Sequence, residues 1–173
     1  MYFILKEPHQ AGSGHILLPR QFCGSDYFLG PKGLKMGSFL PAVAEQLLAD
    51  IQRTYEDTAH IPDDLLIALT FVLGSCVLPA LDLVDRRSVS RLSSPSGRSV
   101  FQVVGGSGRV YTCLTSCHFC PCPSFAYAVL HRGGALMCKH LLAVYLSQAM
   151  GVTQQDAVTD QHMTALLSRG TLP

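Results

Sequence analysis

Residues 120–143 read CPCPSFAYAVLHRGGALMCKHLLA, and this stretch decides how the chain is organised. It carries two short pairs of metal-binding residue types, Cys120 with Cys122 and Cys138 with His140. Three thiolates and one imidazole are a complete ligand set for tetrahedral zinc, and they leave no position open for water. Sulfur and nitrogen donors also suit zinc better than they suit cations that prefer oxygen. The sequence therefore predicts a structural Zn2+ site held by these four residues.

The spacing of the second pair sets a conformational demand. Side chains two residues apart on a helix point about 200° away from one another, so Cys138 and His140 cannot both bind one ion in mid-helix. We expect them in the turn that enters a helix, and apolar residues at helical spacing over 141–149 supply that helix. In the first pair, the prolines on either side of Cys122 fix the backbone and favour a bent knuckle.

The other cysteines have simpler interpretations. The chain has seven Cys, and Met1–Leu5 is too short and too poor in basic residues for a secretory signal, so we expect a reducing compartment and metal binding rather than disulfides. Single cysteines are most often small buried hydrophobes, which is what we predict for Cys23, Cys76 and Cys113. Cys117 is close enough to the knuckle to replace one of the four ligands, and the sequence leaves that alternative open.

The chain as a whole is unusually apolar, and residues 41–81 are predicted to be helical. Of the 173 residues 48% are hydrophobic and only 14% are charged, against roughly 25% charged in an ordinary domain. Apolar spacing predicts an amphipathic helix from Pro41 to near Thr58, and acids after Pro62 begin a second helix that is apolar on every side. The uncharged run over 65–81 approaches the length of a membrane span, but Gly, Ser and Pro interrupt it. We expect a helix buried in the core or in a subunit interface, and no membrane protein.

Between residues 86 and 114 the apolar period changes from helical to two. Three β-rich runs over 89–92, 100–104 and 110–114 are joined by Gly- and Ser-rich turns, which predicts an antiparallel meander. The glycines of 105–108 do not open a helix and lack a following Gly-Lys-Ser, so they favour a hairpin turn over a phosphate loop. The predicted fold is α+β: N-terminal amphipathic and buried helices, a three-stranded meander, a zinc knuckle and C-terminal helices.

We divide the chain into four parts on these patterns. Residues 1–36, rich in Gly and Pro, are predicted to be a poorly ordered extension. Residues 37–85 form a helical partner-binding segment, and residues 86–150 hold the meander and the zinc finger. Residues 151–173 form a C-terminal helix and tail.

Charge is distributed unevenly although the net charge is only +1. Residues 41–85 carry eight acids and one base, whereas residues 86–140 carry seven bases and no acid. The two faces could cancel within the folded monomer. Alternatively, the second half presents a cationic surface to an acidic protein or to a phosphate backbone. The sequence does not choose between these interpretations.

The pattern Cys-x-Cys, a spacer, then Cys-x-His followed by two residues and Ala resembles the SWIM-type zinc finger signature, carried here by residues 120–122 and 138–143. The resemblance extends to LPAV at 40–43, ALDLVD at 80–85, SSPSGR at 93–98 and CKHLLAVYLSQ at 138–148. These stretches are similar to the SWIM subunits of Shu complexes in homologous recombination. The resemblance covers roughly residues 36–165, and residues 1–35 have no counterpart.

The resemblance implies that Cys120, Cys122, Cys138 and His140 are the metal ligands. It also implies a small partner resembling the recombinase paralogues and, through the complex, an effect on strand-exchange recombinase filaments on single-stranded DNA. The resemblance also implies that the protein acts in the nucleus. The first functional hypothesis is therefore a non-enzymatic adaptor subunit whose apolar helices bind a protein partner.

The sequence also allows two other functions. The finger could bind single-stranded nucleic acid directly, with Phe101 and Tyr111 as stacking surfaces and with the basic residues Arg86, Arg87, Arg91, Arg98 and Arg109. Against this, strand positions 101 and 111 fit the core equally well, and the net charge is near zero. Catalysis could use the adjacent Cys117 and His118 as nucleophile and base. The sequence holds no Gly-x-Ser-x-Gly elbow or phosphate loop, and a zinc ion with four protein ligands has no site for water. We therefore expect no enzyme activity.

Overall fold

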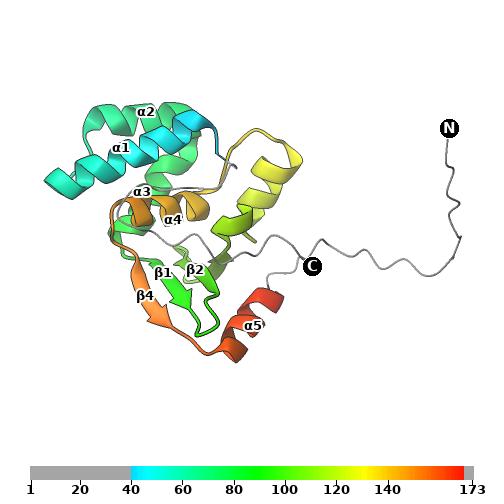
Figure 1. Ribbon diagram of the computed structural model, residues 1–173. Helices are drawn as coiled ribbons and strands as arrows, with labels where there is room; N and C mark the ends of the chain where they lie inside the picture. Colours follow the sequence, from blue (N-terminus) through cyan, green and yellow to red (C-terminus); the bar gives the residue numbers. More distant parts are fainter. Residues whose placement is uncertain (1–39, 170–173) are drawn as a thin grey trace, which may run out of the picture.

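The computed structural model describes residues 40–169, and these confirm the predicted α+β class (Figure 1). The helices are α1 (Ala42–Thr58), α2 (Asp63–Leu73), α3 (Val77–Asp85), α4 (Lys139–Ala149) and α5 (Asp160–Arg169), with a π-helix at Phe125–His131. The strands are β1 (Val89–Ser93), β2 (Ser99–Val104), β3 (Val110–Cys113) and β4 (Gln154–Ala157). The predicted extension over 1–36, with Cys23, lies outside the described residues.

Prolines mark the beginnings of the first two helices. Pro41 and Pro62 occupy the positions before α1 and α2, where the missing N–H costs no helical hydrogen bond. In α1 the buried residues Ala44, Leu48 and Ile51 recur at helical spacing, so that this helix buries one face as predicted. In α2, by contrast, only Leu69 and Leu73 are fully buried, and much of this apolar helix faces outward.

A glycine separates α2 from α3. Gly74 has φ 72° and ψ −149°, a backbone conformation that residues with a Cβ rarely adopt, and a short 3₁₀ turn over Gly74–Cys76 leads into α3. By length and composition, Asp63–Asp85 is the one stretch of the described residues that could cross a membrane. Only a third of the most apolar 18-residue part of this stretch is buried.

The sheet contains one strand more than predicted. Its order is β3-β2-β1-β4, with β1, β2 and β3 antiparallel as the meander requires. The predicted three-stranded meander is confirmed, and a fourth strand is added because β4 pairs parallel with the edge of β1, from Ser90 with Gln154 to Ser93 with Ala157. All four residues of β4 are exposed, so no apolar alternation marks this strand in the sequence.

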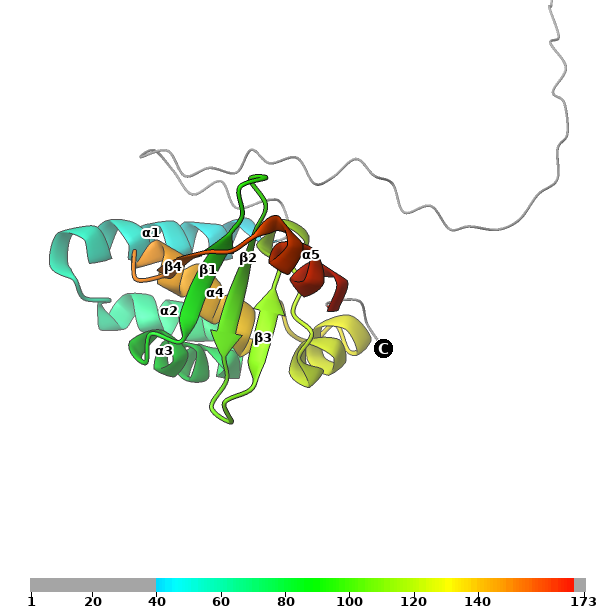
Figure 2. The same ribbon diagram turned by 90° about the horizontal axis from the view of Figure 1, so that it is seen from below.

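Helix α4 is the centre of the core. It packs against α1 and α3 on one side and against β1, β2 and β3 on the other (Figure 2). Because it is covered from both sides, every residue from His140 to Ser147 is buried, not only one face as the periodicity suggested. The knuckle that carries the predicted zinc ligands, described below, is attached to the beginning of this helix.

Helix α5 covers the opposite face of the sheet. Its Met163 is fully buried against Leu92 and Val100, which form a second, smaller apolar cluster. The hairpin predicted at 105–108 is present, with Gly108 at φ 79° and a hydrogen bond from the Gly105 amide to the Arg109 carbonyl at 2.8 Å. This turn brings Tyr111 back toward α4.

Candidate metal centre

The structure brings the four predicted ligands into one buried cluster. The ligand atoms of Cys120, Cys122, Cys138 and His140 all lie within 4.8 Å of one another. Each of these residues is at most 4% exposed. Sequence positions 18 residues apart thus meet at one point, and the cluster can hold a metal ion with three sulfur donors and one nitrogen donor.

The second pair sits where its spacing requires. Cys138 is the residue before α4, with an extended backbone at φ −93° and ψ 167°, and His140 lies in the first turn of the helix. The change from extended to helical backbone lets both side chains face one point, which a continuous helix would forbid. The positive end of the α4 dipole also favours a thiolate at Cys138.

The first pair lies on a loop closed by backbone hydrogen bonds. Leu114 and Phe119 exchange N–H···O bonds of 2.9 Å in both directions, which ties the end of β3 to the start of the knuckle. Beyond Pro123, the Phe125 amide donates to the Cys122 sulfur at 3.3 Å. The same turn begins the Phe125–His131 helix, so the spacer between the pairs is partly helical.

Contacts among the three thiols shift their pKa values in opposite directions. Hydrogen bonds from Cys120 and Cys138 hold the pKa of the Cys122 thiol well below its usual value. The pKa of Cys120 is raised by its contacts with Cys113 and Cys122, and the pKa of Cys138 by its contacts with Cys120 and Cys122. One negative charge is therefore easily held in the cluster, whereas three thiolates need a cation between them. A divalent metal ion bound there would supply that charge.

The structure separates the ligand candidates from the other cysteines. Cys113 is fully buried behind Cys120, as the core interpretation predicted, and Cys76 is half-buried. Cys117 is exposed, and its sulfur lies 4.0 Å from the Leu114 carbonyl, outside the four-residue cluster. This geometry favours Cys120, Cys122, Cys138 and His140 over any set that includes Cys117.

The structure favours the core interpretation of the two candidate stacking residues. Tyr111, considered as a stacking surface for nucleotide bases, stacks instead on His140 with ring centroids 4.2 Å apart. Phe101, its proposed companion, is only 4% exposed and belongs to the core. Both aromatic surfaces are therefore used within the fold.

His118 is a candidate base in the sequence, and the structure gives it a bridging position. Its Nε2 lies 2.8 Å from the Leu136 carbonyl, and its Nδ1 lies 3.0 Å from the Tyr145 hydroxyl. Burial raises the pKa of Tyr145, so its hydroxyl stays protonated. The bridge joins the knuckle to α4 and to the segment before Cys138. Nothing in the local spacing signals these long-range contacts.

Comparison with curated proteins identifies the family. Over 134 residues the chain is 68% identical to zinc finger SWIM domain-containing protein 7 of Danio rerio, which covers 78% of this chain and 96% of the relative. The chain belongs to the zinc finger SWIM domain-containing protein 7 family. Its human relative of that name is 52% identical over 132 residues, 76% of this chain and 94% of the relative. A Dictyostelium discoideum homolog is 29% identical over 92 residues, 53% of this chain and 59% of the relative.

Membership of the zinc finger SWIM domain-containing protein 7 family confirms the resemblance drawn from residues 120–143. No family model matches the chain, and no solved structure matches it. The family name and the Cys3His cluster agree on a metal-binding finger at the centre of the domain.

Proposed function

We propose that this chain is a zinc-binding, non-enzymatic adaptor subunit of a Shu-type complex. The observation that carries the proposal is the closed, buried Cys3His cluster at the beginning of the central helix α4. A zinc ion bound there would join the knuckle to the core and leave no ligand position for a reacting water. The partner would be a small protein resembling the recombinase paralogues. Through that partner the complex would act in the nucleus on strand-exchange filaments on single-stranded DNA, promoting homologous recombination and DNA repair.

An adaptor role is favoured over catalysis and over direct nucleic-acid binding. Both ring nitrogens of His118 are within hydrogen-bond distance of groups other than Cys117, which argues against a nucleophile–base pair. The burial of Phe101 and the stacking of Tyr111 on His140 remove the two proposed base-stacking surfaces. If direct electrostatic binding nevertheless occurs, the isolated chain will bind single-stranded DNA with an affinity that falls steeply as salt is added.

The test is affinity purification from cells with mass spectrometry, comparing the wild-type chain with His140→Ala. His162→Ala is the matched control, because His162 is exposed on α5 and distant in sequence from the ligands. We expect one zinc ion per wild-type chain and a recombinase-paralogue partner, with both lost in His140→Ala and both kept in His162→Ala. Recovery of no such partner with the wild-type chain would contradict the Shu-type role, and a wild-type chain without zinc would contradict the metal assignment.

A further inference from the structure

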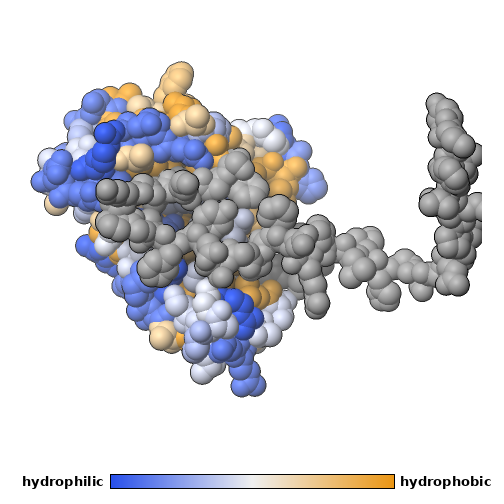
Figure 3. Space-filling model, in the orientation of Figure 1, coloured by the Kyte–Doolittle hydropathy of each residue, from blue (hydrophilic) through white to orange (hydrophobic). Residues whose placement is uncertain are grey.

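Helices α2 and α3 expose large apolar side chains that nothing in the described chain covers. Ile67 is 71% exposed and Phe71 92%, and we call these two residues of α2 the apolar ridge; Leu78 of α3 is 72% exposed. Figure 3 shows hydrophobic atoms standing out along the upper edge of the molecule, over α2. Ile67 and Phe71 are four residues apart and so lie on one face of the helix. Large apolar side chains grouped on a surface mark a site of interaction.

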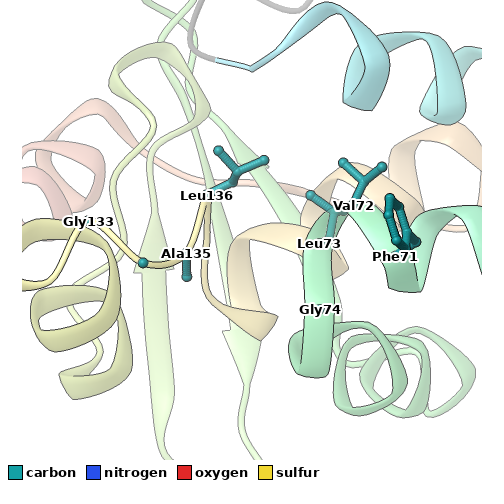
Figure 4. A pocket seen from close by; sticks show the side chains of 8 residues that line it. Phe71, Val72, Leu73, Gly74, Gly133, Ala135 and Leu136 are labelled. Atoms are coloured by element: carbon teal, nitrogen blue, oxygen red, sulfur yellow. The ribbon is translucent and has the colours of Figure 1, made fainter.

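A groove continues the ridge toward the metal finger. It measures about 240 Å³ and runs between residues 71–74, at the end of α2, and residues 133–136, before Cys138. Figure 4 shows the Phe71 and Leu73 side chains on one bank and those of Ala135 and Leu136 on the other. Exposed glycines at 74, 133 and 134 leave backbone groups accessible between these hydrocarbon side chains. The groove thus offers apolar contacts together with backbone hydrogen bonds.

Acidic residues accompany the ridge, and basic residues do not. No Lys or Arg occurs between Arg53 and Arg86, whereas six acids do. Asp64 lies three residues before Ile67 on the same face of α2, and both Asp63 and Asp64 are exposed. Among the described residues, the Arg86–Asp82 ion pair is the only one between the acidic residues of 41–85 and the basic residues of 86–140. Arg132, the residue before the opposite bank in the sequence, lies 5.4 Å from the centre of the Tyr127 ring.

The acids discriminate among the surfaces that could cover the ridge. A second copy of the chain placed symmetrically on the same face would bring Asp63 and Asp64 against their own counterparts, which like-charge repulsion opposes. An anionic lipid surface would be repelled for the same reason. A protein segment that places apolar side chains on the ridge and Lys or Arg beside the acids satisfies both features.

We infer that the apolar ridge and its groove bind a partner protein whose contact segment presents apolar side chains within a rim of Lys and Arg. The inference rests on the proposed function, because it assigns the binding face of the adaptor. Ile67 and Phe71 are the central contacts, and the acids of α2 set the orientation of the partner.

The test measures the affinity of the purified full chain for the recombinase-paralogue partner recovered with the wild type. We expect Ile67→Ala with Phe71→Ala to weaken binding by about ten-fold or more. The melting temperature should stay unchanged, because both side chains are exposed. Val104→Ser with Val110→Ser is the control, since these half-exposed residues pair with each other on the sheet face away from α4.

The acids of α2 have a test of their own. Asp63→Asn with Asp64→Asn should weaken binding of the partner and reduce the dependence of that binding on salt, whereas Asp156→Asn on β4 should do neither.

The outcomes separate the inference from the proposed function. If the wild-type chain binds the partner and Ile67→Ala with Phe71→Ala binds it equally well, the assigned face is wrong and the adaptor role stands. If the wild-type chain binds no such partner, both are overturned. Two further results would also overturn the inference. One is self-association, seen by sedimentation, that Ile67→Ala with Phe71→Ala abolishes. The other is binding to vesicles of phosphatidylcholine and phosphatidylserine that the same two substitutions abolish.

Discussion

Tyr111 stacks on His140, with ring centroids 4.2 Å apart and ring planes inclined by 25°. The guanidinium of Arg109 lies 5.4 Å from the centre of the Tyr111 ring. The absence of a side chain at Gly105 permits this arrangement, because a Cβ there would lie 3.1 Å from Tyr111 Cε2 and 3.6 Å from His140 Nε2. The Nδ1 atom of His140 faces the Cys120 sulfur at 3.8 Å. The β2–β3 hairpin therefore fixes the orientation of the His140 imidazole.

The stacked ring predicts an effect on metal affinity without the loss of any ligand. Tyr111→Ala should lower zinc affinity by about ten-fold, the lower end of the range for residues that orient metal ligands. Tyr111→Phe keeps the ring and should retain the wild-type affinity. Competition with a chromophoric chelator measures both. Equal affinities for Tyr111→Ala and the wild type would show that α4 alone orients His140.

Substitution of the cysteines one at a time should define the ligand set. Cys138→Ser should abolish stoichiometric zinc binding and unfold the domain, because structural zinc sites contribute roughly 10–16 kcal/mol, comparable to or more than the total stability of a typical domain, about 5–15 kcal/mol. Mass spectrometry under native conditions and circular dichroism would record the two losses.

The controls for that substitution are the two nearby thiols outside the cluster. Cys117→Ser, at an exposed position, should keep one zinc ion and the wild-type melting temperature. Cys113→Ala should keep the zinc ion and lose about 1 kcal/mol of stability from a small core cavity. A Cys117→Ser chain that loses its zinc would show that Cys117 replaces one of the four assigned ligands.

Features that depend on neighbouring residues could be predicted from the sequence, whereas features that depend on distant residues could not. Cys138 and His140 could be placed at the beginning of a helix because their spacing permits few other geometries. The strand β4 could not be foreseen, because it is held by backbone pairing with β1 and shows no apolar alternation. The roles of Tyr111 and His118 depend on contacts with residues 18 to 29 positions away, which no local pattern encodes.

The apolar character of α2 was visible in the sequence, but the direction in which it points was not. A continuous apolar run fits a core helix and an interface helix equally well. The structure distinguishes the two, since Leu69 is buried and Phe71 is 92% exposed within one turn of the same helix.

The backbone at Gly74 predicts a stability effect that depends on conformation alone. With φ 72° and ψ −149°, a residue with a Cβ is strained whatever space surrounds it, and no atom lies within 4 Å of the added Cβ. Gly74→Ala should therefore lower the free energy of unfolding by about 1–3 kcal/mol. Gly106→Ala, where the Cβ also meets open space but φ is not positive, should change it by less than about 0.5 kcal/mol. Urea denaturation of both variants makes the comparison.

Asp160 predicts a pH dependence in the attachment of α5. Its carboxylate accepts a hydrogen bond from the Ser96 amide at 3.1 Å and lies 3.6 Å from Arg98. Hydrogen bonds from Ser96 and Ser94 lower the pKa of this carboxyl group below its ordinary value. Because the pKa is lower in the folded state, the stabilisation is complete above the unfolded pKa of about 4 and is lost as the pH falls through the folded value.

The amide resonance of Ser96 in nuclear magnetic resonance spectra should report this titration directly. We expect its chemical shift to change only below pH ~4 and the amide protection of α5 to fall over the same range. Asp160→Asn should remove the titration and leave α5 less protected at neutral pH, because the charged partner of Arg98 is gone. Asp156→Asn, an equal loss of charge on the neighbouring strand β4, should leave both signals unchanged. A Ser96 shift that still titrates in Asp160→Asn would assign the pH dependence to another carboxylate.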